Sequence, residues 1–413
     1  MSLPNGFLDE LRSRICLSDV VGRKVQWDLR KSNQARGDMW APCPFHQEKT
    51  ASFHVDDNKG FYYCFGCQAK GDAIGFIKET ENVNFIEAVE ILASEVGLQM
   101  PEFDPKSKEK ADRNKILLEI MEQSVNFFRL TLNSNQGKHA LEYLKKRGLS
   151  SDAIERFEIG FAPADQTTLT QKLIDKGYDL DAIIETGMSV KSDESNRLYD
   201  RFRARIMFPI RDSRGRCIAF GGRSLDPTAR AKYLNSPETP LFDKGSNLYN
   251  LVSARSAVGR GEPLIVAEGY MDVIALDSGN FNGAIAPLGT AITEKQLQLM
   301  WRISPEPIIA LDGDKAGLRA AYRLIDLSLP LLRTGKALRF SIMPEGKDPD
   351  DLIRNEGASI FKNLIDEAVP MVDLIWRRET EGKSFDSPER RAGLDKSLSD
   401  VIALIKEKNL KNH

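Results

Sequence analysis

The sequence predicts a multidomain chain in which a small β-rich metal-binding module precedes α+β and α/β folds and a helical C-terminal part. Three observations lead to this prediction. Three of the five cysteines lie within residues 43–67. From about residue 260, short apolar segments alternate with stretches of helical pattern. A chain of 413 residues is also too long for one ordinary hydrophobic core and suits two or three domains.

Composition narrows the classes of function. Hydrophobic residues make up 41% and charged residues 29% of the chain, which is typical of folded domains. The net charge is only −2, so any surface for nucleic acid must be a local basic patch. No apolar run approaches the roughly 18 residues of a membrane span, and the N-terminal segment lacks the apolar stretch of a signal peptide. We therefore expect a cytoplasmic protein with no membrane partner.

The cysteine-rich segment has the spacing of a metal site. Its candidate ligands form two pairs, each with two intervening residues: Cys43 with His46, and Cys64 with Cys67. Three thiolates and one imidazole arranged in this way can surround one structural Zn²⁺. The segments 53–55 and 61–63 between them alternate like strands, which predicts a zinc ribbon. A disulfide beside an unrelated histidine is the alternative, and a reducing compartment disfavours it.

Helical patterns follow this segment. Phe85, Val89, Leu92 and Val96 fall on one face of a predicted helix. Residues 101–113 are charged, contain proline and have almost nothing to bury, so we expect a linker there. A second amphipathic helix follows, in which apolar residues recur at helical spacing: Ile116, Leu117, Ile120, Met121, Phe127 and Phe128.

Strands are predicted in the middle of the chain. The segments RIMFPI and CIAFGG, separated by DSRG, indicate a hairpin. Four further strand candidates then alternate with helical stretches: PLIVAE, GAIAPLG, PIIALD and LRFSIM. This alternation predicts a parallel α/β sheet. Residues 352–413 have a mainly helical pattern.

Acidic residues follow three of these four strands: Glu268 and Asp272, then Asp312 and Asp314, then Asp348 and Asp350. Ligand sites of open α/β sheets lie at the carboxyl ends of the strands. Carboxylate oxygens favour Mg²⁺ or Mn²⁺, and several of them allow a two-ion site for phosphoryl transfer. Solvated turns are one alternative. An EF-hand is another, but Ala316 and Arg323 stand where its loop needs oxygen ligands.

A basic segment precedes the acids. Ten Lys or Arg and three Asp lie between Arg197 and Lys232. Arg201, Arg203 and Arg205 alternate, so on a strand they would share one face. The glycines before Arg223 allow a ligand to approach the backbone closely. Because phosphate chemistry uses both cations and metal ions, we expect this segment to bind anions.

The ordered motifs resemble bacterial replicative DNA primase of the DnaG type over essentially the whole chain. They are CPFHQEKTASF, YYCFGC, ERFEIGFAP, YDRFRARIMFPI, AFGGR, KYLNSPET, EGYMDV, PLGTA, DGDKAG and GKDPDDL. The resemblance implies a zinc ribbon followed by a polymerase domain with a Toprim subdomain, a Rossmann-like parallel sheet. It also implies a nucleotidyltransferase that makes short RNA primers from ribonucleoside triphosphates on single-stranded DNA during replication.

The resemblance also implies roles for individual residues. Glu268, Asp312 and Asp314 match the principal ligands of catalytic Mg²⁺ or Mn²⁺, and further acids of the same cleft are Asp272, Asp348 and Asp350. The basic groove for template and nucleotides is matched by Arg156, Arg223, Lys232 and Tyr233, to which the charge pattern adds Arg201 and Arg203. Ala51 and Ala231 stand where the family usually has proline, and neither position supplies a ligand.

This interpretation divides the chain into five parts: a zinc-binding domain (1–100), a linker (101–113), an N-terminal basic subdomain (114–258), a Toprim subdomain (259–345) and a helical subdomain (346–413). The family continues into a C-terminal domain that binds the DnaB-type replicative helicase. This sequence has no counterpart of that domain, which puts helicase docking by this chain in doubt.

Two other classes of protein stay open. The Toprim pattern alone also fits topoisomerases and nucleases, although the zinc module and KYLNSPET argue against them. A zinc-dependent single-strand-binding protein without catalysis is the non-enzymatic alternative, and the three acidic clusters argue against it. A primase–helicase fusion is excluded, because the GKS at residues 382–384 lacks the first glycine of a P-loop.

Overall fold

The computed structural model describes residues 6–46, 50–81, 83–101, 105–192, 197–226, 228–229, 231–289 and 291–412. The chain divides into two compact units, Met1–Ala111 and Asp112–His413. The division falls within the predicted linker, but residues 105–113 begin α5 (Pro105–Leu132), a continuous helix of 28 residues. Residues 109–112 are exposed, as expected for a stretch with little to bury. Lys, Glu and Ala favour helix even without burial, which is why this charged stretch is not an irregular linker.

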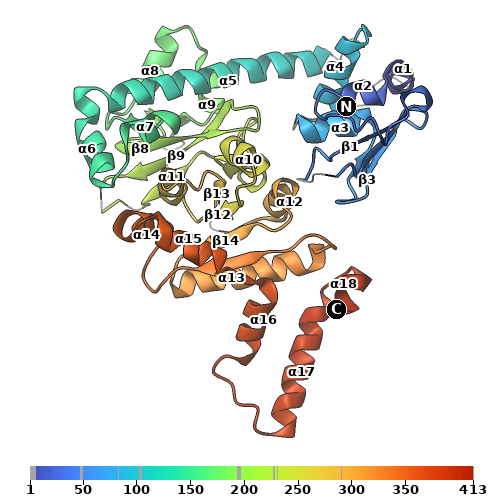
Figure 1. Cartoon of the computed structure of the whole chain (residues 1–413). Helices are drawn as coiled ribbons and strands as arrows, with labels where there is room; N and C mark the ends of the chain where they lie inside the picture. The colour runs from blue at the N-terminus through green and yellow to red at the C-terminus, as the bar shows by residue number, and fades with distance from the viewer. Residues whose placement is uncertain are drawn as a thin grey trace. The chain divides into compact units, whose positions relative to one another are not determined.

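The first unit is built on the predicted ribbon (Figure 1). Its antiparallel sheet has the order β1 (Asp38–Ala41), β2 (Phe53–Asp56), β3 (Phe61–Cys64), β4 (Lys70–Gly71). Strands β2 and β3 contain the predicted segments 53–55 and 61–63, which confirms them. Alternate residues of β1 and β2 are buried, so one face of the sheet covers a core and the other faces solvent.

Helices enclose the buried face of this sheet: α1 (Phe7–Arg14), α2 (Leu17–Val21), α3 (Ala73–Thr80) and α4 (Phe85–Glu95). The 3₁₀ turn η1 (Gln34–Arg36), which precedes β1, has no buried residue. The rings of Phe53, Tyr62 and Phe76 pack together, with centroids 5.0–6.2 Å apart. Helix α4 begins with a capping box and buries Val89 and Leu92 as predicted. Phe85, expected on the same face, is exposed because it is the first residue of the helix.

The second unit begins with an antiparallel sheet covered by α5. The elements of this part of the chain, after α5, are η2 (Asn135–Gly137), α6 (Lys138–Lys146), α7 (Ser151–Arg156), β5 (Gly160–Ala162), α8 (Thr168–Asp175), α9 (Leu180–Glu185), β6 (Ser189–Lys191), β7 (Leu198–Asp200), β8 (Arg205–Arg211), β9 (Cys217–Ser224) and β10 (Tyr233–Asn235). Strands β6 and β7 pair with each other in a separate two-stranded sheet. The sheet order is β10-β9-β8-β5, and β8–β9 is the predicted hairpin. Predicted apolar residues of α5, including Leu117, Ile120 and Phe128, are buried in the same core as Phe220 of β9.

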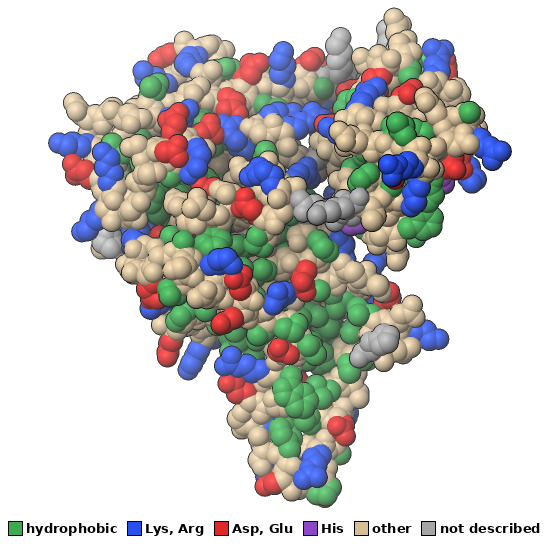
Figure 2. Space-filling view, in the orientation of Figure 1, with side chains coloured by type: hydrophobic (Ala, Val, Ile, Leu, Met, Phe, Trp, Pro, Cys, Tyr) green, Lys and Arg blue, Asp and Glu red, His purple; other side chains and the backbone are tan. Residues whose placement is uncertain are grey.

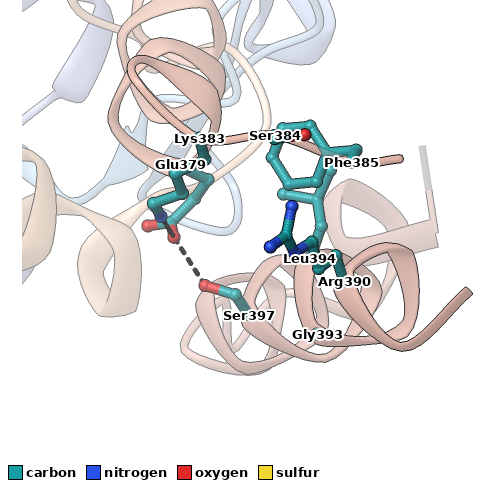
Figure 3. Close-up of a pocket in the computed structure, with 8 residues that line it drawn as sticks. All are labelled: Glu379, Lys383, Ser384, Phe385, Arg390, Gly393, Leu394 and Ser397. Carbon is teal, nitrogen blue, oxygen red and sulfur yellow. Dashed lines mark hydrogen bonds and ion pairs between the residues drawn. The ribbon is translucent and has the colours of Figure 1, made fainter. Parts of the chain in front are cut away.

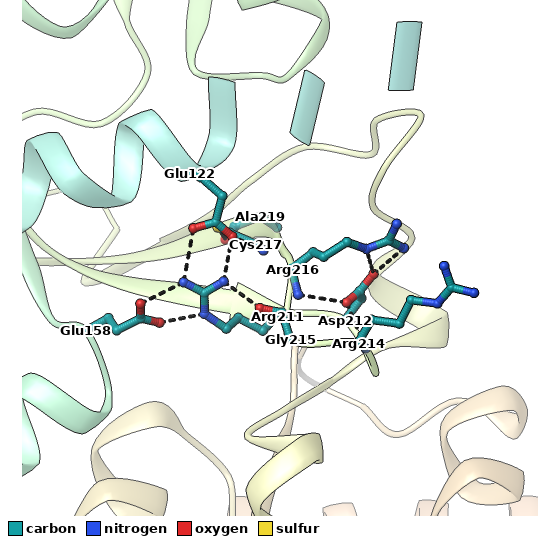
Figure 4. A network of polar contacts seen from close by, with 9 residues as sticks. All are labelled: Glu122, Glu158, Arg211, Asp212, Arg214, Gly215, Arg216, Cys217 and Ala219. Carbon is teal, nitrogen blue, oxygen red and sulfur yellow. Dashed lines mark hydrogen bonds and ion pairs between the residues drawn. The ribbon is translucent and has the colours of Figure 1, made fainter. Parts of the chain in front are cut away.

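A polar network anchors the far end of this hairpin to α5 (Figure 4). Arg211 donates to both carboxylate oxygens of Glu158, at 2.5 and 2.7 Å, and to Glu122 at 2.7 Å. Glu122, on α5, also accepts from the backbone N–H of Cys217 at 2.9 Å. One guanidinium thereby joins three chain segments through charge-assisted hydrogen bonds, which fixes the register of the hairpin on the helix.

A six-stranded sheet follows, with the order β11-β13-β12-β14-β15-β16. Its elements are η3 (Lys244–Ser246), β11 (Leu248–Tyr249), α10 (Leu251–Gly259), β12 (Ile265–Val266), α11 (Tyr270–Ser278), β13 (Ala284–Pro287), α12 (Glu294–Ile303), β14 (Ile308–Leu311), α13 (Lys315–Ser328), η4 (Leu329–Leu331) and β15 (Arg339–Ile342). The four predicted strands are mutually parallel, and the two edge strands are antiparallel to them. The predicted parallel sheet is thus confirmed.

Both faces of this sheet are buried, which accounts for the nearly continuous apolar strands. Ile265 and Ile308 pack in one core with residues of α11, whereas Val266 and Ile309 pack in another with residues of α13. The carboxyl ends of β12, β14 and β15 therefore lie side by side between two layers of helices (Figure 1). This edge of the sheet carries the predicted acids.

The C-terminal part is mainly helical, as predicted: α14 (Pro349–Glu356), α15 (Ala358–Asp366), the short strand β16 (Val369–Pro370), α16 (Met371–Thr380), α17 (Pro388–Ala403) and α18 (Lys408–Asn412). Figure 2 shows acidic and basic side chains mingled over the face in view, with apolar side chains gathered over the C-terminal helices. Val372 and Trp376 are among the exposed apolar residues there. Among the described residues, no helix is long and apolar enough to cross a membrane.

Candidate metal centres and nucleic-acid interface

The four predicted zinc ligands meet at one point of the first unit. One ligand atom from each of Cys43, His46, Cys64 and Cys67 lies within 4.8 Å of the others. The sulfurs of Cys43 and Cys67 are 3.8 Å apart, and Cys64 Sγ lies 3.8 Å from His46 Nδ1. Tetrahedral Zn–S bonds of about 2.3 Å place two sulfurs roughly 3.8 Å apart. The donor set and its spacing therefore fit zinc.

Hydrogen bonds from the backbone and between side chains hold the sulfurs in place. The backbone N–H of Phe45 donates to Cys43 Sγ, and that of Cys67 donates to Cys64 Sγ, both at 3.4 Å. The hydrogen bond between Cys67 and Cys43 lowers the pKa of the Cys67 thiol to about 5 and raises that of Cys43, so the thiolate is favoured at Cys67. At Gly66, a Cβ would lie 2.7 Å from His46 Nε2, so a glycine makes room for the imidazole. The described residues form no disulfide, and His46 lies beside the cysteines, so the geometry does not match a disulfide with an unrelated histidine.

A row of rings crosses the solvent-facing side of the ribbon, and sequence analysis gave it no role. Trp40, His54 and Tyr63 are direct cross-strand neighbours on β1, β2 and β3. Trp40 stacks on His54 at 4.5 Å and on Phe65 at 5.6 Å, and Phe65 is largely exposed. Lys31 Nζ lies 4.8 Å from the centre of the Trp40 ring. Exposed rings beside a cation can stack with unpaired bases and attract their phosphates.

The second centre lies at the carboxyl ends of the parallel strands. Glu268 follows β12, and Asp312 follows the neighbouring strand β14. The backbone N–H of Asp312 donates to Glu268 Oε1 at 3.3 Å, so the two strand ends are in contact. Asp312 Oδ1 is buried and has no hydrogen-bond partner among the described residues. A buried, unsatisfied carboxylate oxygen costs free energy that a bound cation would recover.

The charges of these acids act on one another. Burial, followed by repulsion from Glu268 and Asp348, raises the pKa of Asp312 to about 7. Burial also raises the pKa of Glu268, and repulsion from Asp314 adds to it. The pKa of Asp272 is raised well above its usual range by burial and then by Asp348 and Asp312. Carboxylates that repel one another in this way favour a divalent cation, so this edge of the sheet also fits a metal.

Two of the predicted acids begin helices. Asp314 Oδ1 accepts from the backbone N–H groups of Ala316 and Gly317, both at 2.7 Å, as the N-cap of α13. Asp348 Oδ1 accepts from the N–H of Asp351 at 2.6 Å as the N-cap of α14. These caps orient both carboxylates and use one oxygen of each.

The tightest group of carboxylates among the described residues is Asp348, Asp350 and Asp351, with ligand atoms within 4.8 Å. Its charge is largely neutralised by arginines. Asp350 is buried and pairs with Arg147, and Asp351 pairs with Arg354. Glu268 and Asp312, at the ends of β12 and β14, form no ion pair at salt-bridge distance within the described ranges. Arg147 lies 203 residues from its partner, so no local sequence signal could have revealed it.

The prediction that Arg201, Arg203 and Arg205 share one strand face is wrong. Strand β7 ends at Asp200 and β8 begins at Arg205, with Ala204 in the left-handed region (φ 50°) between them. Arg201 donates to the carbonyl oxygen of Asn235 at 3.1 Å, and Arg205 donates to that of Ala231 at 3.0 Å. Arg203 is exposed, 4.9 Å from the Tyr199 ring. Backbone carbonyls thus occupy two of the three guanidinium groups.

Arg223, Lys232 and Tyr233 do lie together. Arg223 and Tyr233 are paired across β9 and β10, and Arg223 Nη1 donates to the Tyr233 hydroxyl at 2.5 Å. The Arg223 guanidinium also lies over the Tyr233 ring, 5.3 Å from its centre. Lys232 precedes Tyr233 and is exposed. Arg156 has a different partner: its guanidinium forms an ion pair with the Asp277 carboxylate at 2.6 Å.

Two residues that sequence analysis missed join this basic strand to the acidic edge. The hydroxyl of Tyr270, which follows Glu268 by two residues, donates to Asn235 Oδ1 at 2.8 Å. Asn235 Nδ2 in turn donates to the carbonyl oxygen of Leu288 at 2.8 Å. Gly221 makes room for Tyr270, since a Cβ there would lie 2.4 Å from the ring. At Gly222 a Cβ would lie 2.8 Å from the Phe202 ring, so the two glycines that were expected to admit a ligand admit these two side chains.

A recess of about 470 Å³ lies between α16 and α17 (Figure 3). The Glu379 side chain accepts from the Ser397 hydroxyl at 2.5 Å across it, and Lys383, Phe385 and Arg390 also line it. None of the predicted site residues lines this recess.

Three family models match the chain in the order that the sequence predicts. The CHC2 zinc finger matches residues 3–108, the N-terminal domain of the DNA primase catalytic core matches 127–255, and the Toprim domain matches 262–340. Residues of the zinc cluster, the basic strand and the Glu268–Asp312 edge fall within the first, second and third matches respectively.

Curated relatives and solved structures agree with these matches. The DNA primase of Pasteurella multocida is 40% identical over 98% of this chain and 68% of the relative. That of Pseudomonas putida is 40% identical over 97% of this chain, which spans 61% of the relative's length. A structure of the DnaG primase catalytic domain bound to single-stranded DNA is 38% identical, with a TM-score of 0.68 over 73% of this chain and 94% of that one. The chain therefore belongs to the DnaG-type family of bacterial DNA primases.

Proposed function

We propose that this chain synthesises short RNA primers on single-stranded DNA by transferring nucleotidyl groups from ribonucleoside triphosphates. The observation that carries the proposal is the acidic edge of the parallel sheet, where Glu268 lies against Asp312 and Asp312 Oδ1 is buried without a partner among the described residues. Membership of the primase family supports it. So does the related DnaG catalytic domain, whose structure contains single-stranded DNA.

Glu268, Asp312 and Asp314 are proposed to hold catalytic Mg²⁺ or Mn²⁺, with two ions in the full site. When bound, such ions lower the pKa of an attacking 3′-hydroxyl and neutralise the triphosphate. The fixed caps of Asp314 and Asp348 would keep these carboxylates oriented as nucleotides enter and leave. Asp272, almost completely buried, is proposed as a further acid of the same cleft. Asp350, paired with Arg147, would position its neighbours.

The basic strand is proposed to hold phosphates of template and nucleotide. Arg223 and Tyr233 form a hydrogen-bonded pair, and exposed Lys232 and Arg203 add positive charge. Contacts of this kind position a nucleic acid without reading its bases. Arg201 would support the strand through the Asn235 carbonyl oxygen rather than touch the ligand. Arg156, which pairs with Asp277, would reach phosphates with the exposed part of its side chain.

The first unit is proposed to bind one structural Zn²⁺ through Cys43, His46, Cys64 and Cys67. Four protein ligands leave no open coordination position for catalysis, so the ion would stabilise the ribbon. The row of rings on the outer face would then be a rigid surface for unpaired template bases.

The test is incorporation of labelled ribonucleotides on unprimed single-stranded DNA in Mg²⁺. We expect short oligoribonucleotides from the unmodified chain and none from Asp312→Asn. Asp373→Asn, which changes an exposed carboxylate on α16, is the matched control and should retain activity. Cleavage of the DNA without synthesis would instead favour the nuclease or topoisomerase alternative.

A further inference from the structure

A cavity of about 540 Å³ lies against the α13 face of the six-stranded sheet. Its lining includes Val266, Ile309 and Leu311 on or next to β12 and β14, together with residues of α13. The segment after β13 contributes Ile292. The cavity is thus mostly apolar and opens at the carboxyl ends of the parallel strands, where open α/β sheets bind ligands.

The sequence of α13 explains why this space is not filled. Ala316 and Ala320 lie one helical turn apart and line the cavity. An alanine methyl group occupies little of the space that a larger side chain would fill at these positions. The adjacent stripe of the same helix, which includes Ala321 and Ile325, is buried in the core and holds the helix on the sheet. The cavity therefore results from small side chains on a firmly packed helix.

Two charged side chains line the cavity, Glu268 and Arg323. The positive charge of Arg323 acts on the Glu268 carboxylate, so the two groups lie within electrostatic reach of each other. Arg323 is exposed, and no hydrogen bond or ion pair of its guanidinium is found within the described part of the chain. The cavity thus offers an apolar interior, one cation and one carboxylate acceptor.

We propose that this cavity binds a small aromatic anion. Its flat apolar body would lie between α13 and the sheet, its anionic group would pair with Arg323, and an N–H donor would reach Glu268. The volume is within the range of about 300–1,000 Å³ that small-molecule sites occupy, and an apolar lining with a few polar groups is typical of them. Electrostatic pairing at the mouth would set the orientation of the ligand.

Occupancy would oppose binding of the divalent cation. Glu268 is shared by the cavity and the proposed metal site, and one carboxylate held by an N–H donor is a poorer metal ligand. By linkage, each ligand then weakens the other by the same factor. This second step depends on the proposed function, because it assumes that Glu268 ligates the cation. The cavity itself does not depend on it.

The probe is 8-anilino-1-naphthalenesulfonate, an aromatic anion with an N–H donor that fluoresces in apolar sites. It is titrated into the whole chain without DNA or nucleotide. We expect a saturable component that Ala320→Trp abolishes by filling the cavity. Arg323→Gln should weaken that component about tenfold, as expected for loss of a charge-assisted hydrogen bond. Arg319→Gln is the matched control, because Arg319 is exposed on the same helix and does not line the cavity.

Circular dichroism checks that each variant is folded. If Ala320→Trp does not fold, Ala320→Leu and Arg323→Gln provide the test. A saturable component that survives cavity filling, or that Arg319→Gln weakens as much as Arg323→Gln, overturns the proposal. Adding Mg²⁺ should weaken the component in the unmodified chain but not in Glu268→Gln. The fluorescence titration and the synthesis assay can fail independently. Absence of probe binding would not count against primer synthesis, and a chain without polymerase activity could still bind the probe.

Discussion

Asp312 and Glu268 meet across two neighbouring parallel strands, where the backbone N–H of Asp312 donates to Glu268 Oε1 at 3.3 Å. This bond holds the Glu268 carboxylate beside a second carboxylate whose Oδ1 is buried without a partner in the described ranges. Burial raises the pKa of both acids, repulsion from Glu268 adds to the rise at Asp312, and repulsion from Asp314 adds to the rise at Glu268. Without a cation, the two carboxyl groups are disfavoured from being ionised at the same time. A bound divalent cation would balance both negative charges.

Asp312→Asn should abolish primer synthesis while leaving affinity for single-stranded DNA unchanged or slightly higher. The substitution keeps the shape of the side chain but removes a metal-binding charge beside a polyanion. We expect synthesis to fall at least about a hundredfold, because metal-ion stabilisation of the transition state is worth several kcal/mol. Primer synthesis and fluorescence-anisotropy binding are measured on the same preparation. Near-normal synthesis by this variant in Mg²⁺ would remove the acidic edge from the mechanism.

Arg223→Ala should weaken binding of single-stranded DNA and reduce its dependence on salt. Removing one side chain that binds a phosphate flattens the slope of log affinity against log salt concentration by roughly 0.7 for a single strand. Arg223→Lys keeps the charge but loses the planar contact with Tyr233, so it should preserve the slope and still reduce affinity. Arg260→Ala removes an exposed guanidinium that pairs with Glu262 and is the control. An unchanged slope for Arg223→Ala would show that this residue does not contact phosphate.

Cation binding should depend on pH through Asp312. Burial and repulsion raise its pKa to about 7, whereas an unfolded Asp has a pKa of about 4. Between these values the folded metal-free chain holds a proton that the unfolded chain has released, so stability falls as pH rises through this window. Mg²⁺ must displace that proton and should therefore bind more tightly at pH 8 than at pH 6. Calorimetry in buffers of different ionisation enthalpy measures the release, which Asp312→Asn should eliminate.

The sequence predicted the elements that follow local patterns. The zinc ligands, the hairpin and the four parallel strands all follow from spacing and alternation within short segments. It failed where distant segments decide the outcome. Alternation of Arg201, Arg203 and Arg205 looked like a strand face, but the chain bends at Ala204 and two of the three guanidinium groups bind carbonyls of later residues. Likewise, Asp350 is neutralised by Arg147, a partner 203 residues away.

Cys64→Ser should release zinc and unfold the first unit while the second unit stays folded. Cys64 is completely buried, and its sulfur accepts from the backbone N–H of Cys67, so its loss breaks both the metal site and the turn around it. Elemental analysis of protein purified without chelator should give one zinc per unmodified chain and almost none in the variant. Limited proteolysis should then cleave mainly before residue 112. Unmodified protein without zinc would contradict the assignment of the four ligands.

Tyr270→Phe should destabilise the second unit and slow synthesis, because Tyr270 joins the acidic edge to the basic strand through Asn235. Removing its hydroxyl leaves Asn235 Oδ1 without this donor, at a cost of about 1–3 kcal/mol. Tyr249 provides a matched control, since its ring lies 4.8 Å from that of Tyr270 and its buried hydroxyl has no partner among the described residues. Tyr249→Phe deletes an unsatisfied polar atom and should be neutral or stabilising.

Thermal unfolding followed by circular dichroism separates these two variants. Tyr270→Phe should lower the midpoint by roughly 2–6 °C, and Tyr249→Phe should not lower it. Equal effects of both substitutions would mean that ring packing alone joins the two parts. A loss of synthesis in Tyr270→Phe with unchanged affinity for DNA would show that the bond to Asn235 positions the basic strand against the acids during the reaction.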